Sequence, residues 1–514
     1  MAADHVHHPQ YPVENLSKAQ SMTTAPKAIR SLRMPEPDNP PALPQDRLQR
    51  LWAWGMAASG MSYVWRPSTI EGIRQILTYA SALGIPVGLR GAGRSYGDAS
   101  LNSEGICLDI TRMNRILDWD PTTGIIRVEP GVTIGQLWQY VIEDGWWPSV
   151  VPGTMFPTVA GCVAMNVHGK NQFKAGTIGD HVLEFELMLA DGTVRRCNRE
   201  EDAELFHAAI GSFGMLGCFT SLTLDLKRVH SGFLRVEPIA AHNLGEMLAI
   251  METRRSTADY LVAWVDCFAR GGSLGRGLIH QANYLAPGED PFPAQSLCVQ
   301  NQELPDTFLF GLVPKAVMWR LMKPFVNPPG MRLVNLGKYL AGLRQSGKTF
   351  YETHAAFAFL LDYVPNWKNA YLPGGLIQYQ VFIPHTNAEA FFREQLTLCQ
   401  KAGLVPFLGV LKRHRPDDFL MSYLVDGWSL ALDFKVTPRN RQRLWDLCAK
   451  MDAMAMDAGG RFYFAKDLTL SKPWRDRFLS EERVQRFLEL KHKLDPQNLL
   501  QTDLYRRVFG TRPF

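Results

Sequence analysis

A glycine-rich stretch directly after a predicted strand constrains this chain more than any other segment. The apolar run 85–89 ends, and Gly91, Gly93 and Gly97 then follow within seven residues. Glycine tolerates positive φ and has no Cβ, so successive backbone N–H groups can converge on an anion such as a pyrophosphate. The spacing is GxGxxxG rather than GxGxxG, and a strand-like run, 105–109, follows instead of an amphipathic helix. A nicotinamide-type dinucleotide loop is therefore not expected, while a plain glycine-rich turn remains the alternative here.

A second segment, 152–171, repeats the pattern of glycines among small residues. Gly153 and Gly161 stand among threonines and alanines, and the segment ends in the letters HGKN, 168–171. Small side chains let the backbone approach a flat ligand closely. The two segments together therefore favour a ligand site over a plain turn.

Several motifs in their order along the chain carry a family resemblance. GRSYGD (93–98), HGKN (168–171) and DAELF (202–206) resemble the vanillyl-alcohol-oxidase-type flavoproteins with a PCMH-type FAD-binding domain. GGLIQYQVFIP (374–384) and KHKLDPQNLL (491–500) resemble most the decaprenylphosphoryl-β-D-ribose 2′-oxidase family, which supplies the flavin subunit of an epimerase.

This resemblance implies an α+β chain. It places a two-subdomain PCMH-type FAD-binding domain at 49–230 and a substrate domain at 231–470, built on an antiparallel sheet flanked by helices. Residues 471–514 would return to the FAD-binding domain. Residues 1–48 are polar and rich in proline without an apolar stretch, so we predict a disordered leader.

FAD is the cofactor that the resemblance implies, and no metal is expected. Many relatives tether the flavin through a histidine where this chain has Arg94. Arginine cannot form that bond, so non-covalent FAD is expected. The predicted FAD-binding residues are Arg90, Gly91, Ala92, Gly93, Arg94, Ser95, Tyr96, Gly97, Asp98, Gly153, Thr154, Thr158, Val159, Ala160, Gly161, Met165, Asn166, Val167, His168, Phe219 and Tyr463.

Oxidation of a carbinol needs a flavin that takes the hydride and a protein group that takes the hydroxyl proton. Lys466, in FYFAKD at a predicted strand end, is the first candidate, because desolvation lowers a lysine's pKa. The alternative is a surface salt bridge with Asp467. Tyr96 is the next catalytic candidate. His168 is the third catalytic candidate, because the resemblance places it beside the isoalloxazine within the substrate pocket; the alternative is a core histidine that caps backbone.

A sugar-phosphate pocket is implied by Tyr371, Gln378, Gln380 and Lys412, which match pocket positions in the family. Strand alternation puts the two glutamines on one face. Lys170 and Lys412 are predicted to hold a phosphate as point charges.

One position departs from the family on the strand-like run 428–434. Ala431 stands where relatives carry a cysteine near the flavin. Hydride transfer does not need that cysteine, so catalysis is expected to survive. Alternation predicts that Ala431, Ser429 and Asp433 point toward the pocket together.

Composition bears on partners and location. The net charge is +5, with 20% charged residues and no dense block of Lys and Arg, so no nucleic acid partner is expected. The eight cysteines form no CxxC pair, which favours reduced thiols in the cytoplasm.

The segment 287–329 mixes prolines with apolar runs. We interpret it either as a packed insertion or as a mobile lid that meets a lipid tail or a membrane surface. The resemblance also allows a periplasmic location.

Three functions stay open at this point. The first is oxidation of the 2′-hydroxyl of a polyprenyl-phosphoryl pentose to a ketone, half of an epimerisation, with a short-chain NAD(P)H-dependent keto-reductase as partner. The second is an oxidase or dehydrogenase for a free sugar, alditol or aldonolactone. The third is a non-catalytic flavoprotein.

Overall fold

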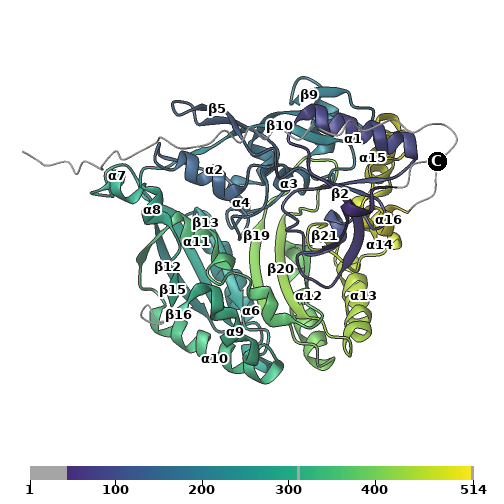
Figure 1. The fold of residues 1–514 in the computed structure, drawn as a ribbon. Helices are drawn as coiled ribbons and strands as arrows, with labels where there is room; N and C mark the ends of the chain where they lie inside the picture. Colours follow the sequence, from purple (N-terminus) through teal and green to yellow (C-terminus); the bar gives the residue numbers. More distant parts are fainter. Residues whose placement is uncertain (1–42, 309–312, 511–514) are drawn as a thin grey trace, which may run out of the picture.

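The computed structural model describes residues 43–308 and 313–510 (Figure 1). Its strands are β1 (Leu48–Trp52), β2 (Ser59–Trp65), β3 (Val87–Arg90), β4 (Ile106–Asp109), β5 (Ile116–Asp120), β6 (Ile125–Val128), β7 (Trp146–Trp147), β8 (Val182–Met188), β9 (Val194–Asn198), β10 (Cys218–Asp225), β11 (Lys227–Arg228), β12 (Phe233–Ala241), β13 (Tyr260–Val265), β14 (Gly277–Tyr284), β15 (Thr307–Phe308), β16 (Val313–Pro314), β17 (Phe350–Thr353), β18 (Leu376–Pro384), β19 (Leu408–His414), β20 (Gly427–Lys435) and β21 (Arg461–Phe462).

The α-helices are α1 (Ile70–Leu83), α2 (Ile134–Val141), α3 (Val159–Ala164), α4 (Gln172–Ala175), α5 (Ala203–Ala209), α6 (Leu244–Arg254), α7 (Pro293–Ser296), α8 (Val299–Gln302), α9 (Met318–Met322), α10 (Pro328–Gln345), α11 (His354–Ala358), α12 (His385–Lys401), α13 (Arg441–Asp457), α14 (Lys472–Leu479), α15 (Glu481–Leu494) and α16 (Asp503–Phe509).

The N-terminal part contains two sheets. The first has the order β1-β2-β4-β3, with β2, β4 and β3 parallel, and the second is antiparallel in the order β5-β6-β10-β8-β9. Helix α1 lies between β2 and β3 in the sequence. Its N-cap is Thr69, whose hydroxyl accepts a hydrogen bond from the Gly72 N–H at 3.0 Å, and its C-cap is Gly84 with a φ of 62°. A hydroxyl N-cap and a left-handed glycine end are ordinary helix boundaries.

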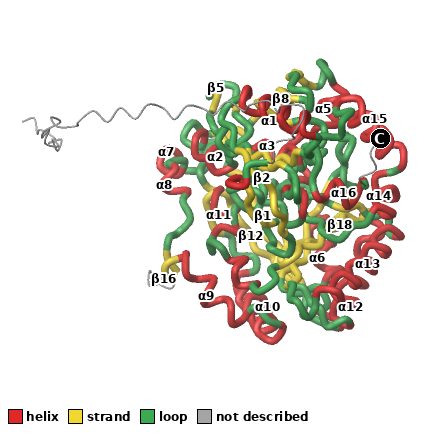
Figure 2. Tube along the Cα trace, turned by 45° about the vertical axis from the view of Figure 1, so that its right-hand side comes forward, coloured by secondary structure: helices red, strands yellow, loops and turns green. Residues whose placement is uncertain are grey.

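The C-terminal part is built on an eight-stranded antiparallel sheet with the order β17-β12-β14-β13-β19-β20-β18-β21. Side chains alternate across it. Leu261 and Val265 of β13 share a core with Met247 of α6, whereas Val262 and Trp264 face a cavity. Helices α6, α12 and α13 cover the core face, and Figure 2 shows α12 and α13 at the side of the molecule away from α9 and α10.

The end of the chain returns to the first sheet. Val87 of β3 donates its N–H to the Leu499 carbonyl at 2.7 Å and accepts from the Gln501 N–H at 2.9 Å. The Asp503 carboxylate accepts from Ser103, both from its N–H and from its hydroxyl. Helices α15 and α16, drawn in yellow, therefore lie beside the N-terminal elements, drawn in purple, in Figure 1.

Helices and strands are mixed as the predicted α+β class requires. The predicted leader lies outside the described residues as far as 42, but residues 43–48 belong to the fold, because Leu43 is buried and Leu48 pairs with Tyr63. The described parts of 287–329 contain α7, α8, α9 and two short strands.

All eight cysteines are unpaired. In the described ranges, no helix is long and apolar enough to cross a membrane.

Candidate active site

A cavity of about 630 Å³ lies where the two glycine segments meet the β13, β14, β18, β19 and β20 face of the large sheet. Of the predicted FAD-binding residues, those lining it are Arg90, Gly91, Ala92, Gly93, Arg94, Ser95, Tyr96, Gly153, Thr154, Thr158, Ala160, Gly161, Met165, Val167, His168, Phe219 and Tyr463. All five predicted substrate residues, Lys170, Tyr371, Gln378, Gln380 and Lys412, line the same cavity, and so does Lys466. The fold thus brings together residues spread over nearly 380 positions of the sequence.

The two glycine segments touch each other at Gly91. A Cβ at this position would lie 2.2 Å from the Thr158 hydroxyl, so only glycine leaves room for the contact. Thr158 is the N-cap of α3, and its hydroxyl accepts from the Gly161 N–H at 3.2 Å. Gly93 has a φ of 62°, a left-handed conformation that favours glycine. The glycines predicted from the motif therefore have a definite steric reason.

Gly97 and Asp98 do not line the cavity, contrary to the prediction. A Cβ on Gly97 would lie 1.8 Å from the Asp467 carbonyl oxygen, so this glycine permits close packing of two loops. The Asp98 carboxylate accepts two hydrogen bonds from the Arg507 guanidinium, at 2.8 and 2.9 Å. Both residues hold the loop against the C-terminal segment.

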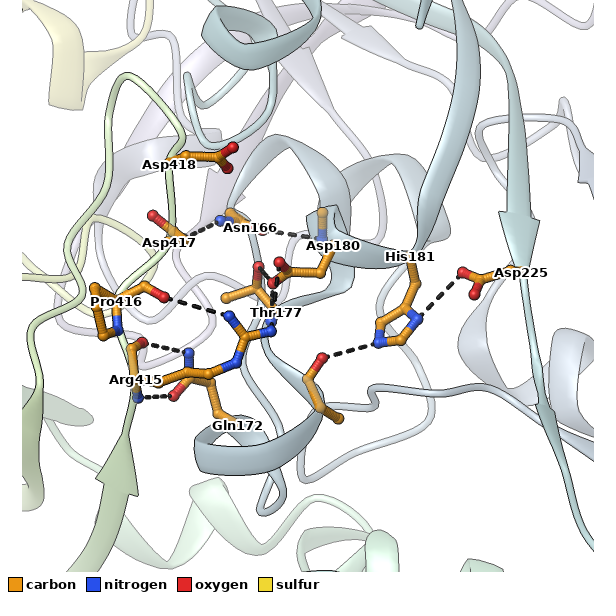
Figure 3. Close-up of polar contacts among 12 residues, drawn as sticks. Asn166, Gln172, Thr177, Asp180, His181, Asp225, Arg415, Pro416, Asp417 and Asp418 are labelled. Carbon is orange, nitrogen blue, oxygen red and sulfur yellow. Dashed lines mark hydrogen bonds and ion pairs between the residues drawn. The ribbon is translucent and has the colours of Figure 1, made fainter. Parts of the chain in front are cut away.

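Val159 and Asn166 also lie away from the cavity. Val159 is fully buried, and its N–H donates to the Val132 carbonyl at 2.7 Å. The Asn166 side-chain N–H₂ donates to the Asp417 carboxylate at 2.9 Å, and its side-chain oxygen accepts from the Gly179 N–H at 3.0 Å (Figure 3). These contacts give both residues a structural role.

Lys466 is partly buried beside Tyr96. Its Nζ lies 3.9 Å from the centroid of the Tyr96 ring. Burial lowers the pKa of Lys466, the positive charge of Lys412 lowers it further, and Asp433 opposes both. The alternative salt bridge is absent, because Asp467 instead forms an ion pair with Arg507 at 2.9 Å. A lysine held this way can lose its proton near neutral pH.

Tyr96 is a weaker acid than an ordinary tyrosine. Its side chain is buried, and burial together with the charge of Asp433 raises the pKa of the phenol well above 10. The ring therefore stays neutral and presents its π face to Lys466, which favours the charged ammonium.

Asp433 is a functional candidate that the predicted site residues did not include. It is fully buried in β20, its pKa is raised by burial, and it accepts a hydrogen bond from the Gln378 Nε2 at 2.6 Å. Only its position on the pocket-facing side of the strand pointed to it in the sequence. Asp433 and Lys466 interact electrostatically, so the protonation of each depends on the other.

The glutamine pair lies as alternation predicted. Gln378 and Gln380 face the cavity from β18, while Tyr379 packs against Phe462 on the other side. Ala431 lines the cavity and is the antiparallel partner of Gln380.

Basic side chains gather at the sheet side of the cavity. Burial lowers the pKa of Lys412 to about 8 and that of Lys170 to about 7, and Lys170 donates to the Phe357 carbonyl. Two residues not predicted from the sequence join them. Lys338 of α10 has its pKa lowered by burial to about 8, and His280 of β14 has its pKa lowered to about 4 by burial and by Lys338 and Lys170. Both come from elements without a recognisable motif.

Comparison with known proteins agrees with this geometry. Residues 61–198 match the family described as FAD binding domain. The chain is 28% identical over 470 residues, 90% of its length and 97% of the relative, to the decaprenylphosphoryl-beta-D-ribose oxidase of Mycolicibacterium smegmatis. A part of the chain is 32% identical over 167 residues to a D-lactate dehydrogenase of Archaeoglobus fulgidus, and a part is 28% identical over 174 residues to the L-gulonolactone oxidase of Mus musculus. These two matches cover 31% and 34% of the chain, and 38% and 39% of the relatives.

The protein is an FAD-dependent oxidoreductase. The cavity of this oxidoreductase suits FAD, because the two abutting glycine segments supply backbone N–H groups for a pyrophosphate. The buried Arg94 Nε has no hydrogen-bond partner in the described residues, and Arg94 lines the cavity in which a flavin would bind. Arg94 carries its guanidinium 4.7 Å from the Phe156 ring centroid.

Proposed function

We propose that this oxidoreductase oxidises the 2′-hydroxyl of a polyprenyl-phosphoryl pentose to a ketone, as half of an epimerisation. The observation that carries the proposal is a group of lysines, Lys170, Lys338 and Lys412, that line the cavity without an ion-pair partner among the described residues. Such charges favour an anionic substrate, and the similarity over 90% of the chain to a decaprenylphosphoryl-ribose oxidase supports the same class.

FAD, when bound, supplies the hydride acceptor for the carbinol carbon. The chain supplies the base: neutral Lys466 takes the hydroxyl proton as the C–H bond breaks. The resulting ammonium is stabilised by the Tyr96 ring and by the negative charge of Asp433, both of which favour the charged form of Lys466. Gln378, held by its hydrogen bond to Asp433, fixes the direction of that carboxylate.

The phosphate would lie among Lys170, Lys338 and Lys412. Each is a compact point charge that neutralises phosphate without demanding one geometry. The pKa values of these three lysines are lowered mainly by burial, so the single negative charge of a bound phosphodiester would raise those values again and favour the charged ammonium forms. Lys466 can act as the neutral base because burial and the positive charge of Lys412 lower its pKa.

The FAD is held non-covalently in this proposal. The position of the tethering histidine in relatives is taken by Arg94, which lines the cavity and has no chemistry for a stable bond to the flavin. Its pKa is lowered by burial, but an arginine remains charged.

A membrane surface is the proposed source of the substrate. Residues 315–348 contain seven Lys and Arg and no Asp or Glu. Apolar side chains in the same segment are exposed: Leu321, Met322, Phe325, Leu333, Val334, Leu336, Leu340 and Leu343. Met322 and Val334 also line the cavity, so this surface is continuous with it. A basic segment with exposed apolar side chains binds the face of an anionic bilayer.

The product would be a reactive keto sugar that another enzyme must reduce. A short-chain NAD(P)H-dependent keto-reductase is the proposed partner, because return of a hydride to the opposite face of the ketone completes an epimerisation. The second candidate function is oxidation of a free aldonolactone or alditol. The similarity of about a third of the chain to an L-gulonolactone oxidase favours it.

Anaerobic flavin bleaching with two substrates distinguishes these functions. A short-chain prenylphosphoryl pentose should bleach the flavin, whereas L-gulonolactone should not. Lys338→Met should raise the substrate concentration for half-maximal bleaching about tenfold, the size expected for a lost charged contact. Lys348→Met, an exposed lysine in the same basic segment, is the matched control. Bleaching by the lactone alone would contradict the proposal.

A further inference from the structure

A buried chain of hydrogen bonds runs from α4 to the cavity. It links Gln172, His414, Ser429, Gln380 and His168, and each of these side chains is at most 5% exposed. Three of them come from β18, β19 and β20, which are neighbours in the sheet. The direction of every hydrogen bond in this chain can be worked out from its first member.

The side-chain amide of Gln172 has a fixed orientation. Its oxygen accepts from the Arg415 N–H at 2.8 Å and its N–H₂ donates to the Arg415 carbonyl at 2.8 Å (Figure 3). If the amide were turned over, its N–H₂ would face the Arg415 N–H and its oxygen would face the Arg415 carbonyl, so neither pair could form a hydrogen bond. The Gln172 oxygen is therefore an acceptor for the next group as well.

His414 must donate to that oxygen. Its Nδ1 lies 3.2 Å from the Gln172 Oε1, which requires a proton on Nδ1. The ring is neutral, because burial and the charges of Lys412 and Arg413 lower the pKa of His414 well below 6.5. A neutral imidazole has one N–H, so Nε2 is an acceptor.

Ser429 then donates to His414. The Ser429 Oγ lies 2.8 Å from the His414 Nε2, and this bond uses the single hydroxyl proton. The group facing the other side of Oγ must be a donor, and it is the Gln380 Nε2 at 3.1 Å. The Gln380 amide is therefore fixed with its N–H₂ inside the chain.

The second N–H of Gln380 decides the state of His168. The Gln380 Nε2 lies 3.2 Å from the His168 Nε2, which must accept. The ring of His168 is neutral, since burial and the charge of Lys412 lower its pKa well below 6.5. Its proton is then on Nδ1, which faces the Gly169 carbonyl at 3.5 Å.

We propose that Gln172, His414 and Ser429 are positioning residues that hold His168 as the Nδ1-protonated tautomer and fix the Gln380 carbonyl oxygen as a hydrogen-bond acceptor for a substrate hydroxyl. Both N–H groups of Gln380 are used, while its Oε1 has no partner among the described residues and its side chain lines the cavity. The second half of this inference rests on the proposed function. His168 has no free nitrogen lone pair, so it positions Gln380 instead of acting as a base.

The tautomer can be measured without any substrate. Protein loaded with FAD and labelled with ¹⁵N-histidine is examined by long-range ¹H–¹⁵N correlation, and His168→Gln identifies the signals of His168. We expect Nδ1 in the protonated range and Nε2 in the unprotonated range. A protonated Nε2 in the native protein would overturn the hydrogen-bond chain, whatever the substrate.

Gln380→Glu provides a directional test. A glutamate at 380 cannot donate two hydrogen bonds, so His168 should move its proton to Nε2 and donate to the new carboxylate. Gln380→Leu removes both the hydrogen-bond donors and the acceptor of this side chain and serves as the control for packing. A His168 spectrum that stays the same in Gln380→Glu would contradict the proposed relay.

The acceptor role is tested separately with deoxy analogues. Gln380→Leu should weaken binding of a prenylphosphoryl pentose about tenfold, measured by flavin bleaching. One singly deoxygenated analogue should bind the native protein and this variant equally, because it lacks the hydroxyl that Gln380 accepts. If every analogue loses the same factor, Gln380 does not accept from the substrate. Failure of all prenylphosphoryl pentoses to bleach native protein would refute the proposed function but leave the tautomer result standing.

Discussion

Replacement of Lys466 tests the assignment of the base. Lys466→Ala should keep FAD bound, because Lys466 is not among the predicted FAD-binding residues and its Nζ contacts a glycine segment only through the Tyr96 ring. Loss of a positioned base lowers a rate by ~10²–10⁴-fold, or about 2.7–5.4 kcal/mol in the barrier. The assay is stopped-flow flavin reduction at saturating substrate. Lys472→Ala, at an exposed lysine of α14, is the control.

The assignment also predicts how the rate of flavin reduction depends on pH. Only neutral Lys466 can take a proton, so the native reduction rate should rise with pH through a pKa that burial has lowered from 10.5. Lys412 lowers that pKa by like-charge repulsion, so Lys412→Met should move the rise to higher pH. In Lys466→Ala the rise should disappear. A variant with a native rate and an unchanged profile would remove Lys466 from the mechanism.

Three further predictions address the cofactor and the packing. Acid precipitation should release all the flavin as FAD, given Arg94 at the tethering position, and flavin left on the polypeptide would contradict this. Gly97→Ala should lower the free energy of unfolding by ~1–3 kcal/mol, since its Cβ would lie 1.8 Å from the Asp467 carbonyl oxygen; thermal unfolding should show no such loss for Gly272→Ala, where the space is open. Ala431→Cys should form a covalent adduct with a nitroaromatic compound activated by the reduced flavin, detected by mass spectrometry. An adduct on the same strand of the native protein would show that position 431 has been matched wrongly to the cysteine of the family.

Local patterns were enough for the parts of the site that a single segment builds. The two glycine-rich loops and the alternating Gln378 and Gln380 could be recognised from local spacing, although the neighbours that require glycine at Gly91 and Gly97 lie far away in the sequence. Lys338 and His280 gave no such signal, because they reach the cavity only through the packing of α10 and the order of strands in the large sheet.

Long-range partners explain the residues that were assigned differently. Asp98 stands in a motif that favours cofactor binding, but its carboxylate is taken by Arg507, which lies 409 positions later. Asp467 is next to Lys466 in the sequence and also pairs with Arg507. A sequence pattern identifies the donor and acceptor groups in a segment, but it does not show which distant side chain occupies them.

The central claim is that a carbinol C–H of a phosphate-bearing pentose gives its hydride in this cavity. The most direct measurement is anaerobic flavin reduction with a prenylphosphoryl pentose carrying deuterium at C2, with identification of the product. We predict slower reduction of the flavin than with the unlabelled substrate, and a 2-keto product that has lost the deuterium. Reduction at an equal rate with retention of deuterium at C2 would contradict the account.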